Sequence, residues 1–326
     1  MSELALIERI ASRTRRRPGT LLGIGDDAAL LRIEGTAVAT QDLLVEGVHF
    51  RRETIDARDL GHKALAVNLS DLAAMGAEPV AALVGLCLPP DAPGSEDLDA
   101  LYDGMEALAG RHGVTLAGGD VTAGPALVLA VTALGRALPG VAPLRRSGGR
   151  PGDLLCVTGA LGAAAAGLLL LEDPGLGAGL EPGVAEALRA AHRRPEPRVA
   201  AGRALAQGGA RAMIDLSDGL ALDGLRLARA GGVAARIELA ALPLADGVAQ
   251  VAAAAGRDAA LLGAGGGEDY ELLAAVPPER LDALRSAAGV PLTPVGRLER
   301  GAPAAVAVDA AGREVPLAGL GWEHRV

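Results

Sequence analysis

The residues best suited to chemistry in this chain are seven aspartates that recur in short strings containing glycine or serine. Each is expected in a short loop at the edge of an apolar run, and they are Asp26, Asp27, Asp42, Asp71, Asp120, Asp215 and Asp218. Repetition of this placement indicates that the loops converge and that the carboxylates share divalent cations. Magnesium takes hard oxygen ligands, usually only a few carboxylates, and fills its other positions with water and substrate phosphates. The aspartates therefore predict a magnesium-dependent enzyme that acts on phosphates.

A long apolar helix predicted over 57–75 contains three polar residues that helix packing does not explain. In the string GHKALAVNLSDLAAMGAEP, at 61–79, the apolar residues recur at helical spacing and define a core face. Asn68, Ser70 and Asp71 interrupt that face, and buried polar groups are costly unless they have partners. A metal ion would be a suitable partner for Asp71, and the alternative is a simple helix cap.

The string MIDLSDGLALD, at 213–223, predicts a strand, a turn and a helix that begins near residue 219. In one interpretation Asp215, Ser217 or Asp218 only caps this helix by accepting hydrogen bonds from its first amides. A cap requires one such residue, and this turn holds three. Carboxylates at a helix start are stabilised by the helix dipole even without a metal. Capping and metal binding therefore both stay open here.

Two glycine-containing strings suggest close approach of the backbone to a ligand. GIGDDA, at 23–28, matches the dinucleotide-binding pattern, but no convincing strand precedes it and its aspartates would face the pyrophosphate. The P-loop string and the kinase strings HRD and DFG do not occur. GAGGGEDYELL, at 263–273, leads a glycine run into a strand and supplies Glu268 and Asp269 as acceptors. An ATP-dependent enzyme with this sequence must bind its nucleotide by another route.

The histidines carry less information than the aspartates. His49, in the string EGVHF, is readily explained as a loop residue with a satisfied side chain. His62 and His112 are expected in structural positions. His192 and His324 are expected at the surface or as caps.

Periodicity predicts a mixture of helices and strands, an α/β or α+β protein, and not a bundle or a sandwich. The predicted helices cover 2–16, 57–75, 96–112, a segment from 162, 184–191, 196–208, 219–231 and 278–288. The predicted strands cover 28–33, 37–40, 80–88, 127–134, 153–158, 212–215, 233–237, 272–276 and, as the last one, 304–308. A Gly-, Pro- and Arg-rich segment separates the two halves. We expect an N-terminal domain over 1–138, a linker over 139–152 and a C-terminal domain over 153–326.

Bulk composition narrows the possible partners. A chain of 326 residues with 50% hydrophobic residues is expected to fold into globular domains. Its net charge of −9 argues against nucleic acid as a partner. The opening segment does not resemble a signal peptide, and the longest Ala/Leu run, 159–171, is too short to span a bilayer. We expect a cytoplasmic protein without a membrane partner, with Cys87 and Cys156 reduced and buried.

Eight strings together are specific enough to identify a family resemblance. GIGDDAAL, D-LLVEGVHF, GHKALAVNLSDLAAMGA, GGD, RSGGRPGD, IDLSDGL, GGEDYELL and GW-H resemble, in order and spacing, those of the thiamine-monophosphate kinases. The similarity runs from about residue 3 to residue 324. It implies a two-domain architecture like that of aminoimidazole ribonucleotide synthetase, and a homodimer whose N-terminal domains pair through their sheets. It also implies ATP and several Mg²⁺ ions, with thiamine monophosphate as the phosphoryl acceptor and a C-terminal domain that completes the active site.

The resemblance also assigns roles to individual residues. The family's magnesium positions fall on Asp27, Thr40, Gln41, Asp42, Asp71, Asp120, Asp215 and Asp218. The ATP-contacting positions fall on Tyr102, Gly119, Asp120, Arg146 and Ser217. The positions that contact thiamine phosphate fall on His49, Glu268 and Trp322. Among these residues, the ones expected to carry the transfer itself are Asp71, Asp120, Arg146 and Asp218.

Departures from the family's pattern affect two positions, and one ligand position has two adjacent candidates. Gln41 stands where Thr or Ser is usual, so a hydroxyl ligand is lost and only a backbone carbonyl is left. Arg325 replaces a phenylalanine beyond the thiamine-contacting Trp322. Of the two adjacent aspartates, Asp27 matches the ligand position, and Asp26 is expected only to support it.

The expected chemistry is direct in-line transfer, since the acceptor is already an anionic phosphate oxygen and needs no strong base. Repulsion between two polyanions is the main obstacle, and metal ions with a forked contact from Arg146 would offset it. Trp322 would stack on the cationic thiazolium. The alternatives are another ATP-dependent enzyme of the same superfamily, such as aminoimidazole ribonucleotide or selenophosphate synthetase, and a catalytically silent nucleotide-binding protein.

Overall fold

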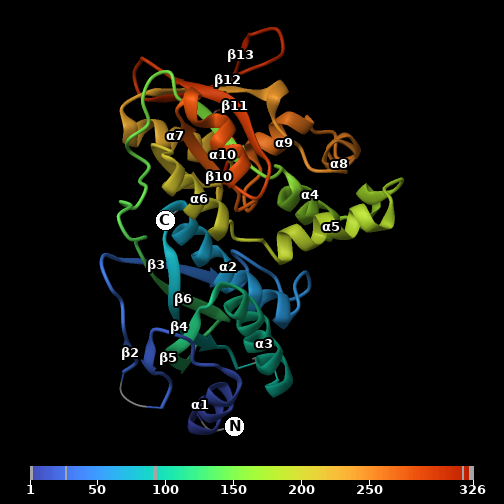
Figure 1. Cartoon of the computed structure of the whole chain (residues 1–326). Helices are drawn as coiled ribbons and strands as arrows, with labels where there is room; N and C mark the ends of the chain where they lie inside the picture. Colours follow the sequence, from blue (N-terminus) through green and yellow to red (C-terminus); the bar gives the residue numbers. More distant parts are fainter. Residues whose placement is uncertain (1–2, 26–27, 91–93, 318, 323–326) are drawn as a thin grey trace. The chain divides into compact units, whose positions relative to one another are not determined.

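Two compact units make up the chain in the computed structural model, which describes residues 3–25, 28–90, 94–317 and 319–322. The first unit comprises Met1–Leu72 and Ala77–Pro139, and the second comprises Ala73–Gly76 and Gly140–Val326. Each unit combines helices with a mixed sheet (Figure 1). The predicted mixed α/β class is therefore confirmed.

A four-stranded sheet in the order β3-β6-β4-β5 forms the frame of the first unit. Its strands are β3 (Ala37–Val45), β4 (Glu78–Leu88), β5 (Thr115–Ala123) and β6 (Val128–Arg136). β4 and β5 are parallel, and the other pairs are antiparallel. A separate antiparallel pair joins β1 (Thr20–Leu22) to β2 (Leu30–Leu31). The helices of this unit are α1 (Glu3–Arg13), α2 (Ala57–Ala74) and α3 (Ser95–His112).

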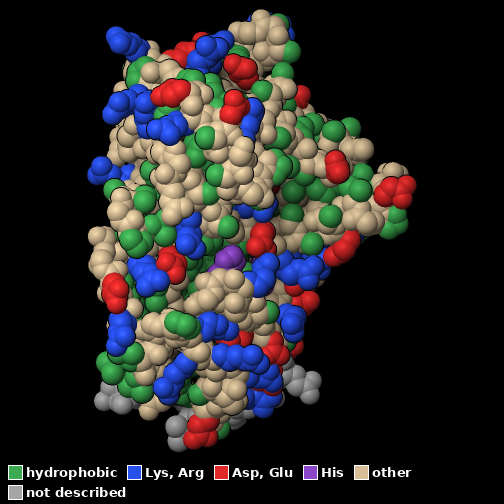
Figure 2. Space-filling model, in the orientation of Figure 1, with side chains coloured by type: hydrophobic (Ala, Val, Ile, Leu, Met, Phe, Trp, Pro, Cys, Tyr) green, Lys and Arg blue, Asp and Glu red, His purple; other side chains and the backbone are tan. Residues whose placement is uncertain are grey.

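Glycines let α2 and α3 pack closely beside the sheet (Figure 1). A Cβ atom on Gly61 would overlap the carbonyl group of Leu101, and one on Gly104 would overlap that of Arg58. α1 is held to α3 by ion pairs, including Arg13 with Asp103 at 2.6 Å. On the face shown in Figure 2, basic and acidic side chains lie next to one another in the region of α1 and α3.

A seven-stranded sheet in the order β13-β12-β9-β11-β7-β10-β8 forms the frame of the second unit. Its strands are β7 (Leu154–Thr158), β8 (Ala212–Asp215), β9 (Ala234–Glu238), β10 (Leu272–Val276), β11 (Leu292–Glu299), β12 (Ala304–Val308) and β13 (Glu314–Val315). Only β9 and β12 pair in parallel among these described strands. The central strands are buried on both faces, and all five residues of β10 are buried, as expected for a sheet covered on both sides.

Helices and short 3₁₀ turns surround this second sheet. The helices are α4 (Ala163–Glu172), α5 (Pro182–Arg193), α6 (Val199–Gly208), α7 (Leu220–Gly231), α8 (Val248–Ala254), α9 (Ala259–Gly265) and α10 (Leu281–Ala287). The 3₁₀ turns are η1 (Pro174–Gly177), η2 (Leu239–Ala241) and η3 (Pro278–Arg280). α4 and α5 lie side by side (Figure 1), and a Cβ atom on Gly167 of α4 would overlap the carbonyl group of Leu188 in α5.

Several predicted elements were misplaced or missed. β8, β10 and β12 match their predicted bounds, whereas β3 extends five residues beyond the predicted end at 40 and so includes Asp42. β5, β11, α8 and α9 were not predicted, and β13 follows the strand expected to be last. The expectation that all seven aspartates lie in loops is also wrong. Asp42 and Asp120 are inside strands and Asp71 is inside a helix.

Two further expectations concern the burial of the cysteines and the absence of a membrane-spanning segment. Cys156 is buried and reduced, but Cys87 is partly exposed, so the expectation that both are buried is half right. No helix in the described part of the chain combines the length and apolarity needed to cross a membrane.

Candidate active site

The first unit brings one pair of predicted metal ligands together, on β3 and α2. The hydroxyl group of Thr40 donates a hydrogen bond to Oδ2 of Asp71. Two residues further along β3, the N–H group of Asp42 donates to Oδ1 of Asn68, one α2 turn before Asp71, at 3.1 Å. Asn68 is fully buried and donates in turn to the carbonyl oxygen of Ala64 at 3.0 Å. Asn68 therefore holds β3 to α2 and has a structural partner, which the sequence did not reveal.

Electrostatics show that Asp42 and Asp71 lie close enough to repel each other. Burial, and then the charge of Asp71, raise the pKa of Asp42 to about 6. Two carboxylates that share a site disfavour each other's ionisation, and a divalent cation would relieve that repulsion. With Thr40 they form a set of hard oxygen donors on one face of β3, the kind of set that magnesium prefers.

Gln41 lies on the opposite face of β3 from this pair. Successive side chains of a strand point to opposite faces, and Gln41 is exposed opposite Thr132 of β6. The side chain of Gln41 is thus directed away from Thr40 and Asp42. Its backbone carbonyl is the group that could serve the predicted metal role.

Asp120 and Gly119 lie in strand β5, not in the expected loop. Asp120 is exposed, and its Oδ1 accepts a hydrogen bond from the N–H group of Val121 at 2.9 Å. In the parallel register Gly119 is opposite Val84, and a Cβ atom on Gly119 would overlap the carbonyl oxygen of that residue. Gly119 is therefore required by the close approach of two strands, and this backbone constraint fixes the position of Asp120.

Tyr102 and His49 occupy different environments in the first unit. Tyr102, in α3, is only 4% exposed, and burial raises its pKa. His49 follows β3, and its Nδ1 accepts a hydrogen bond from the N–H group of Val45 at 3.0 Å. The loop interpretation of His49 is consistent with this bond. Contacts of the two residues with substrates stay predictions.

In the second unit, the polar residues of the IDLSDG turn are not used to cap helix α7. The N-cap of α7 is Gly219, which has no side chain to accept a bond. The two amides just before the helix are bound instead from inside it, where Oδ2 of the fully buried Asp223 accepts from the N–H groups of Asp218 at 3.0 Å and Gly219 at 3.1 Å. The capping interpretation of Asp215, Ser217 and Asp218 is therefore wrong.

Arg226 balances the charge of this turn. Its Nη1 contacts Oδ2 of Asp218 and lies 2.7 Å from Oδ1 of Asp223. Burial raises the pKa of Asp223 to about 6 in spite of these bonds. Asp215, at the end of β8, is 4% exposed, and Asp218 is more accessible, with 22% of its side chain exposed. The turn thus presents the accessible carboxylate of Asp218, which is paired with the partly exposed guanidinium group of Arg226.

The GGGEDYE segment is bound to the IDLSDG turn by main-chain hydrogen bonds. The N–H group of Glu268 donates to the carbonyl oxygen of Ser217 at 2.8 Å, and that of Tyr270 donates to Leu216 at 2.9 Å. Glu268 and Tyr270 have φ angles of 67° and 49°, in the left-handed region that non-glycine residues rarely adopt. Strained backbone of this kind persists only where its surroundings enforce it, and it is concentrated at functional sites.

Side-chain contacts of two further acidic residues fix the same segment. Asp269 accepts from the N–H groups of Gly162 at 2.7 Å and Ala164 at 3.2 Å, at the start of α4. Burial raises the pKa of Asp269 to about 7. Glu271, 3% exposed, accepts from Thr158 at 2.6 Å and forms an ion pair with Arg198 at 2.5 Å. The segment is therefore held by contacts with the start of α4, with Thr158 and with Arg198.

Trp322 approaches the same turn along the backbone, whereas Arg146 lies beside the strand that precedes it. The N–H group of Trp322 donates to the carbonyl oxygen of Asp218 at 3.1 Å, and the Trp322 side chain is 55% exposed. The N–H group of Met213 in β8 donates to the carbonyl oxygen of Arg145 at 3.1 Å, which sets the exposed Arg146 beside the strand that leads into the turn. The second unit thus gathers Ser217, Asp218, Glu268 and Trp322 around one turn.

Among the described residues, no group of three or more Asp, Glu, His or Cys side chains is placed to hold a metal ion. Asp26 and Asp27 lie outside the described residues, as do His324 and Arg325. Magnesium is usually bound through one or two carboxylates together with substrate phosphates, so a pair such as Asp42 and Asp71 is a sufficient protein contribution.

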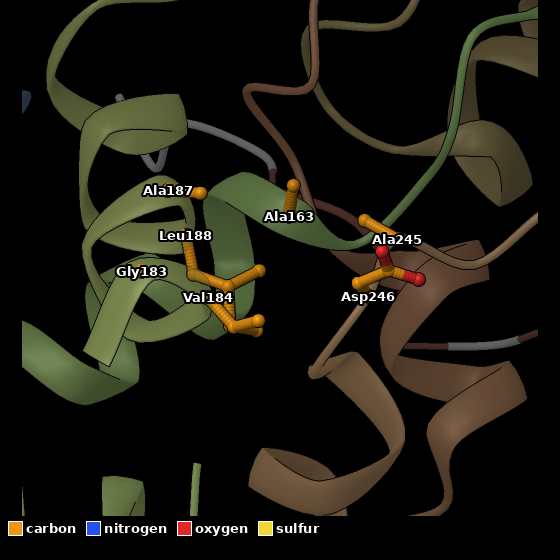
Figure 3. Close-up of a pocket in the computed structure, with 7 residues that line it drawn as sticks. All are labelled: Ala163, Gly183, Val184, Ala187, Leu188, Ala245 and Asp246. Atoms are coloured by element: carbon orange, nitrogen blue, oxygen red, sulfur yellow. The ribbon is translucent and has the colours of Figure 1, made fainter. Parts of the chain in front are cut away.

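A pocket of about 220 Å³ lies elsewhere in the second unit, between α4, α5 and the segment before α8 (Figure 3). Its walls are largely apolar, with Val184 and Leu188 on one side and Asp246 supplying a carboxylate on the other. None of the predicted site residues lines it. Local charge and hydrogen bonding, and not concavity, therefore define the candidate site within each unit.

Four residues around the site were not found from the sequence: His192, Arg198, Asp223 and Arg226. His192 is only 7% exposed, so its expected surface position is wrong. Asp223 offered a signal, because it lies one helical turn after Gly219 in the same string. Arg226 binds Asp218 and Asp223 within the same stretch of chain. His192 and Arg198 act on residues far away in the chain, and no local pattern marks them.

Comparisons with known proteins agree on one family. The AIR synthase related protein N-terminal domain matches residues 25–137, and the corresponding C-terminal domain matches residues 150–309. The thiamine-monophosphate kinase of Mycobacterium tuberculosis is 43% identical over 84% of this chain and 80% of its own length.

Solved structures support the same grouping. The thiamine-monophosphate kinase of Stenotrophomonas maltophilia K279a is 40% identical, with a TM-score of 0.82 and coverage of 97% of this chain and 98% of its own. The complex of AaThiL with AMPPCP and TMP is 30% identical, with a TM-score of 0.78 over 99% of this chain and 96% of its own.

Proposed function

This chain belongs to the thiamine-monophosphate kinase family, and on that premise we propose that it transfers the γ-phosphoryl group of ATP to thiamine monophosphate. The products are thiamine diphosphate and ADP. The observation that carries the proposal is 40% identity to a solved kinase of this name over 97% of the chain. The AaThiL complex holds AMPPCP, an analogue of ATP, together with TMP. Because the donor is ATP, the proposed compartment is the cytoplasm.

Magnesium is the proposed metal, and each unit by itself offers carboxylates as proposed ligands. In the first unit, Asp42 and Asp71 provide hard oxygen donors. Burial, and then the charge of Asp71, raise the pKa of Asp42, and a bound cation would favour the ionised form of both carboxylates. In the second unit, Asp218 is the accessible carboxylate and Asp215 precedes it at the end of β8. Bound magnesium would supply charge neutralisation for the phosphate oxygens.

The proposed work of the protein side chains is positioning. The exposed guanidinium group of Arg146 would bind phosphate oxygens through two parallel hydrogen bonds. The exposed ring of Trp322 would stack on the cationic thiazolium. Glu268 would face the same cationic ring system, because a carboxylate repels the phosphate end. Transfer is direct, since the acceptor oxygen is already anionic and requires no protein nucleophile.

A homodimer is proposed on the basis of the first unit's sheet. The even-numbered side chains of β3 face α2, whereas Ala39, Gln41 and Leu43 point to the other face and are exposed, Leu43 by 51%. Opposite Ala39 and Leu43, strand β6 adds Leu134 and Ala130, which are partly exposed. An apolar sheet surface of this kind is typical of a protein interface.

One assay separates the proposed activity from its alternatives. Purified protein is incubated with ATP, Mg²⁺ and thiamine monophosphate, and thiamine diphosphate is measured by chromatography. The expected result is product that depends on all three components. Absence of product, with product from a control kinase, would reject the proposal and leave a different superfamily reaction or a silent nucleotide-binding protein. Labelled phosphate that stays covalently on the protein would contradict direct transfer.

A further inference from the structure

His192 occupies a core position of α5 although its side chain is polar. The buried residues of α5 are Ala185, Leu188 and His192, at the spacing of the apolar face of an amphipathic helix. A polar group in such a position is costly unless it has a partner. The partner is Glu268, because Nδ1 of His192 lies 3.0 Å from Oε2 of that carboxylate.

The contact with His192 fixes the Glu268 side chain, whose backbone is already held in place. Glu268 sits at a φ of 67° and is anchored by its N–H group to Ser217. The carboxylate lies beyond further rotatable bonds, so a fixed backbone alone leaves it several orientations. A buried imidazole that donates to one of its oxygens removes that freedom. The Glu268 side chain is 27% exposed and the His192 side chain is 9% exposed, so Glu268 is the more accessible member of the pair.

We propose that His192 is a positioning residue, which holds the Glu268 carboxylate toward the cationic ring system of thiamine monophosphate. This inference rests on the proposed function. Prior fixation of a binding group reduces the entropy lost when the ligand binds. His192 therefore acts on the affinity for the acceptor and not on the transfer step, and it has no effect on ATP.

Two substitutions separate the hydrogen bond from the volume of the ring. His192→Leu fills the core position without a donor, and His192→Asn places an amide N–H close to where Nδ1 lies. Loss of a hydrogen bond to a charged group predicts a roughly tenfold rise in KM for thiamine monophosphate in His192→Leu. KM for ATP and kcat are expected to change little, and His192→Asn is expected to recover most of the loss.

A control variant and a double mutant show whether Glu268 transmits the effect. Glu186→Gln breaks an exposed ion pair with Arg193 on the same helix and is expected to leave every constant unchanged. In a Glu268→Ala background, His192→Leu is expected to add nothing to KM, since coupled residues are not additive. A lower kcat at unchanged KM, an additive effect, or no rescue by asparagine would each overturn the inference.

A readout without substrate tests the contact itself. The chain has five histidines, so ¹⁵N-histidine NMR spectra are simple to assign with the His192→Leu variant. Glu268→Gln is expected to shift the His192 signals, and Glu186→Gln is not; unchanged signals in Glu268→Gln would overturn the inference. Failure of the proposed function would appear differently, as wild-type protein that forms no thiamine diphosphate.

Discussion

Asp71 carries the sharpest prediction at the scale of single residues. Its carboxylate accepts the Thr40 hydroxyl and repels the partly buried Asp42. Asp71→Asn keeps the shape and an acceptor for Thr40 but removes the charge that a metal requires. Because metal-bound carboxylates support several kcal/mol of charge stabilisation, activity at ordinary Mg²⁺ is expected to fall at least roughly a hundredfold. Steady-state kinetics over a range of Mg²⁺ concentrations would measure this loss.

The matched control for this substitution is Asp103→Asn. Asp103 is 43% exposed on α3 and pairs with Arg13, and exposed ion pairs contribute little to stability. Both variants are expected to keep the wild-type circular dichroism spectrum. Unchanged turnover in Asp71→Asn would remove Asp71 from the metal site and leave Asp42 without the proposed role.

At the scale of elements, the start of helix α7 depends on one internal carboxylate. Asp223→Ala would leave two amides without their acceptor, that of the partly buried Asp218 and that of the buried Gly219. Unsatisfied buried groups cost about 1–3 kcal/mol each, so the free energy of unfolding of the second unit is expected to fall by about 2–4 kcal/mol. Asp223→Asn keeps one acceptor oxygen and is expected to cost less than half as much.

Urea denaturation monitored by circular dichroism would measure both variants. Asp246→Ala is a suitable control, because Asp246 is an exposed aspartate of the same unit. A stability of Asp223→Ala equal to that of the control would show that α7 starts without this cap.

The start of helix α4 gives a prediction about pH. Burial raises the pKa of Asp269 from 3.8 to about 7, so between these values the folded protein binds a proton that the unfolded chain has lost. The contribution of Asp269 to stability is therefore greatest below about pH 4 and declines as the pH rises to 7. Asp269→Asn resembles the protonated form at every pH. The variant is expected to gain stability relative to the wild-type protein as the pH rises from 5 to 8.

Urea midpoints of the two proteins at pH 5, 6, 7 and 8 would test the sign of this effect. The positive end of α4 favours the ionised carboxylate and opposes the effect of burial. If the effect of the helix end were larger than that of burial, the stability of the wild-type protein would rise relative to that of the variant as the pH rises. That opposite trend would show that the pKa of Asp269 is not raised.

Local sequence patterns predicted the strands that are short apolar runs. They failed for strands in which glycine or aspartate interrupts the apolar run. β8, β10 and β12 are short apolar runs with clear ends, and their bounds were predicted correctly. β5 was hidden by Gly118, Gly119 and Asp120, which look like a loop until the neighbouring strand is considered. β11 contains Gly296, where a Cβ atom would overlap the carbonyl oxygen of Arg236. Glycine at such points reflects pairing between distant segments.

The residue types of the candidate site could be predicted from the sequence, but the hydrogen-bond and ion-pair partners of these residues could not. The strings identified Asp42, Asp71, Asp218 and Glu268, because their types suit metal and cation binding. Their partners lie far away in the chain: Thr40 is 31 residues from Asp71, and His192 is 76 from Glu268 by residue number. Such pairs arise from the packing of whole elements, and a single sequence carries no local signal for them.

At the scale of the whole molecule, the sheet of the first unit explains why a second copy of the chain is proposed. The β3 side chains that face α2 include the buried Val38 and Leu44 together with Thr40 and Asp42. The side chains of Ala39, Gln41 and Leu43 point to the other face and are exposed, and only Gln41 among them is polar. One strand thus serves the candidate metal site on one face and the proposed interface on the other. A dimer would bury the second face and hold the first in a fixed position.

Leu43→Lys tests this arrangement. Leu43 is 51% exposed, in the middle of the proposed interface, and a pair of symmetry-related lysines there would bring like charges into an apolar contact. Light scattering after size exclusion is expected to give twice the chain mass for the wild-type protein and a single chain mass for the variant. Ala253→Lys, on an exposed position of α8, is expected to stay dimeric. Dimeric Leu43→Lys would contradict pairing through this face, and a monomeric wild-type protein would contradict the dimer itself.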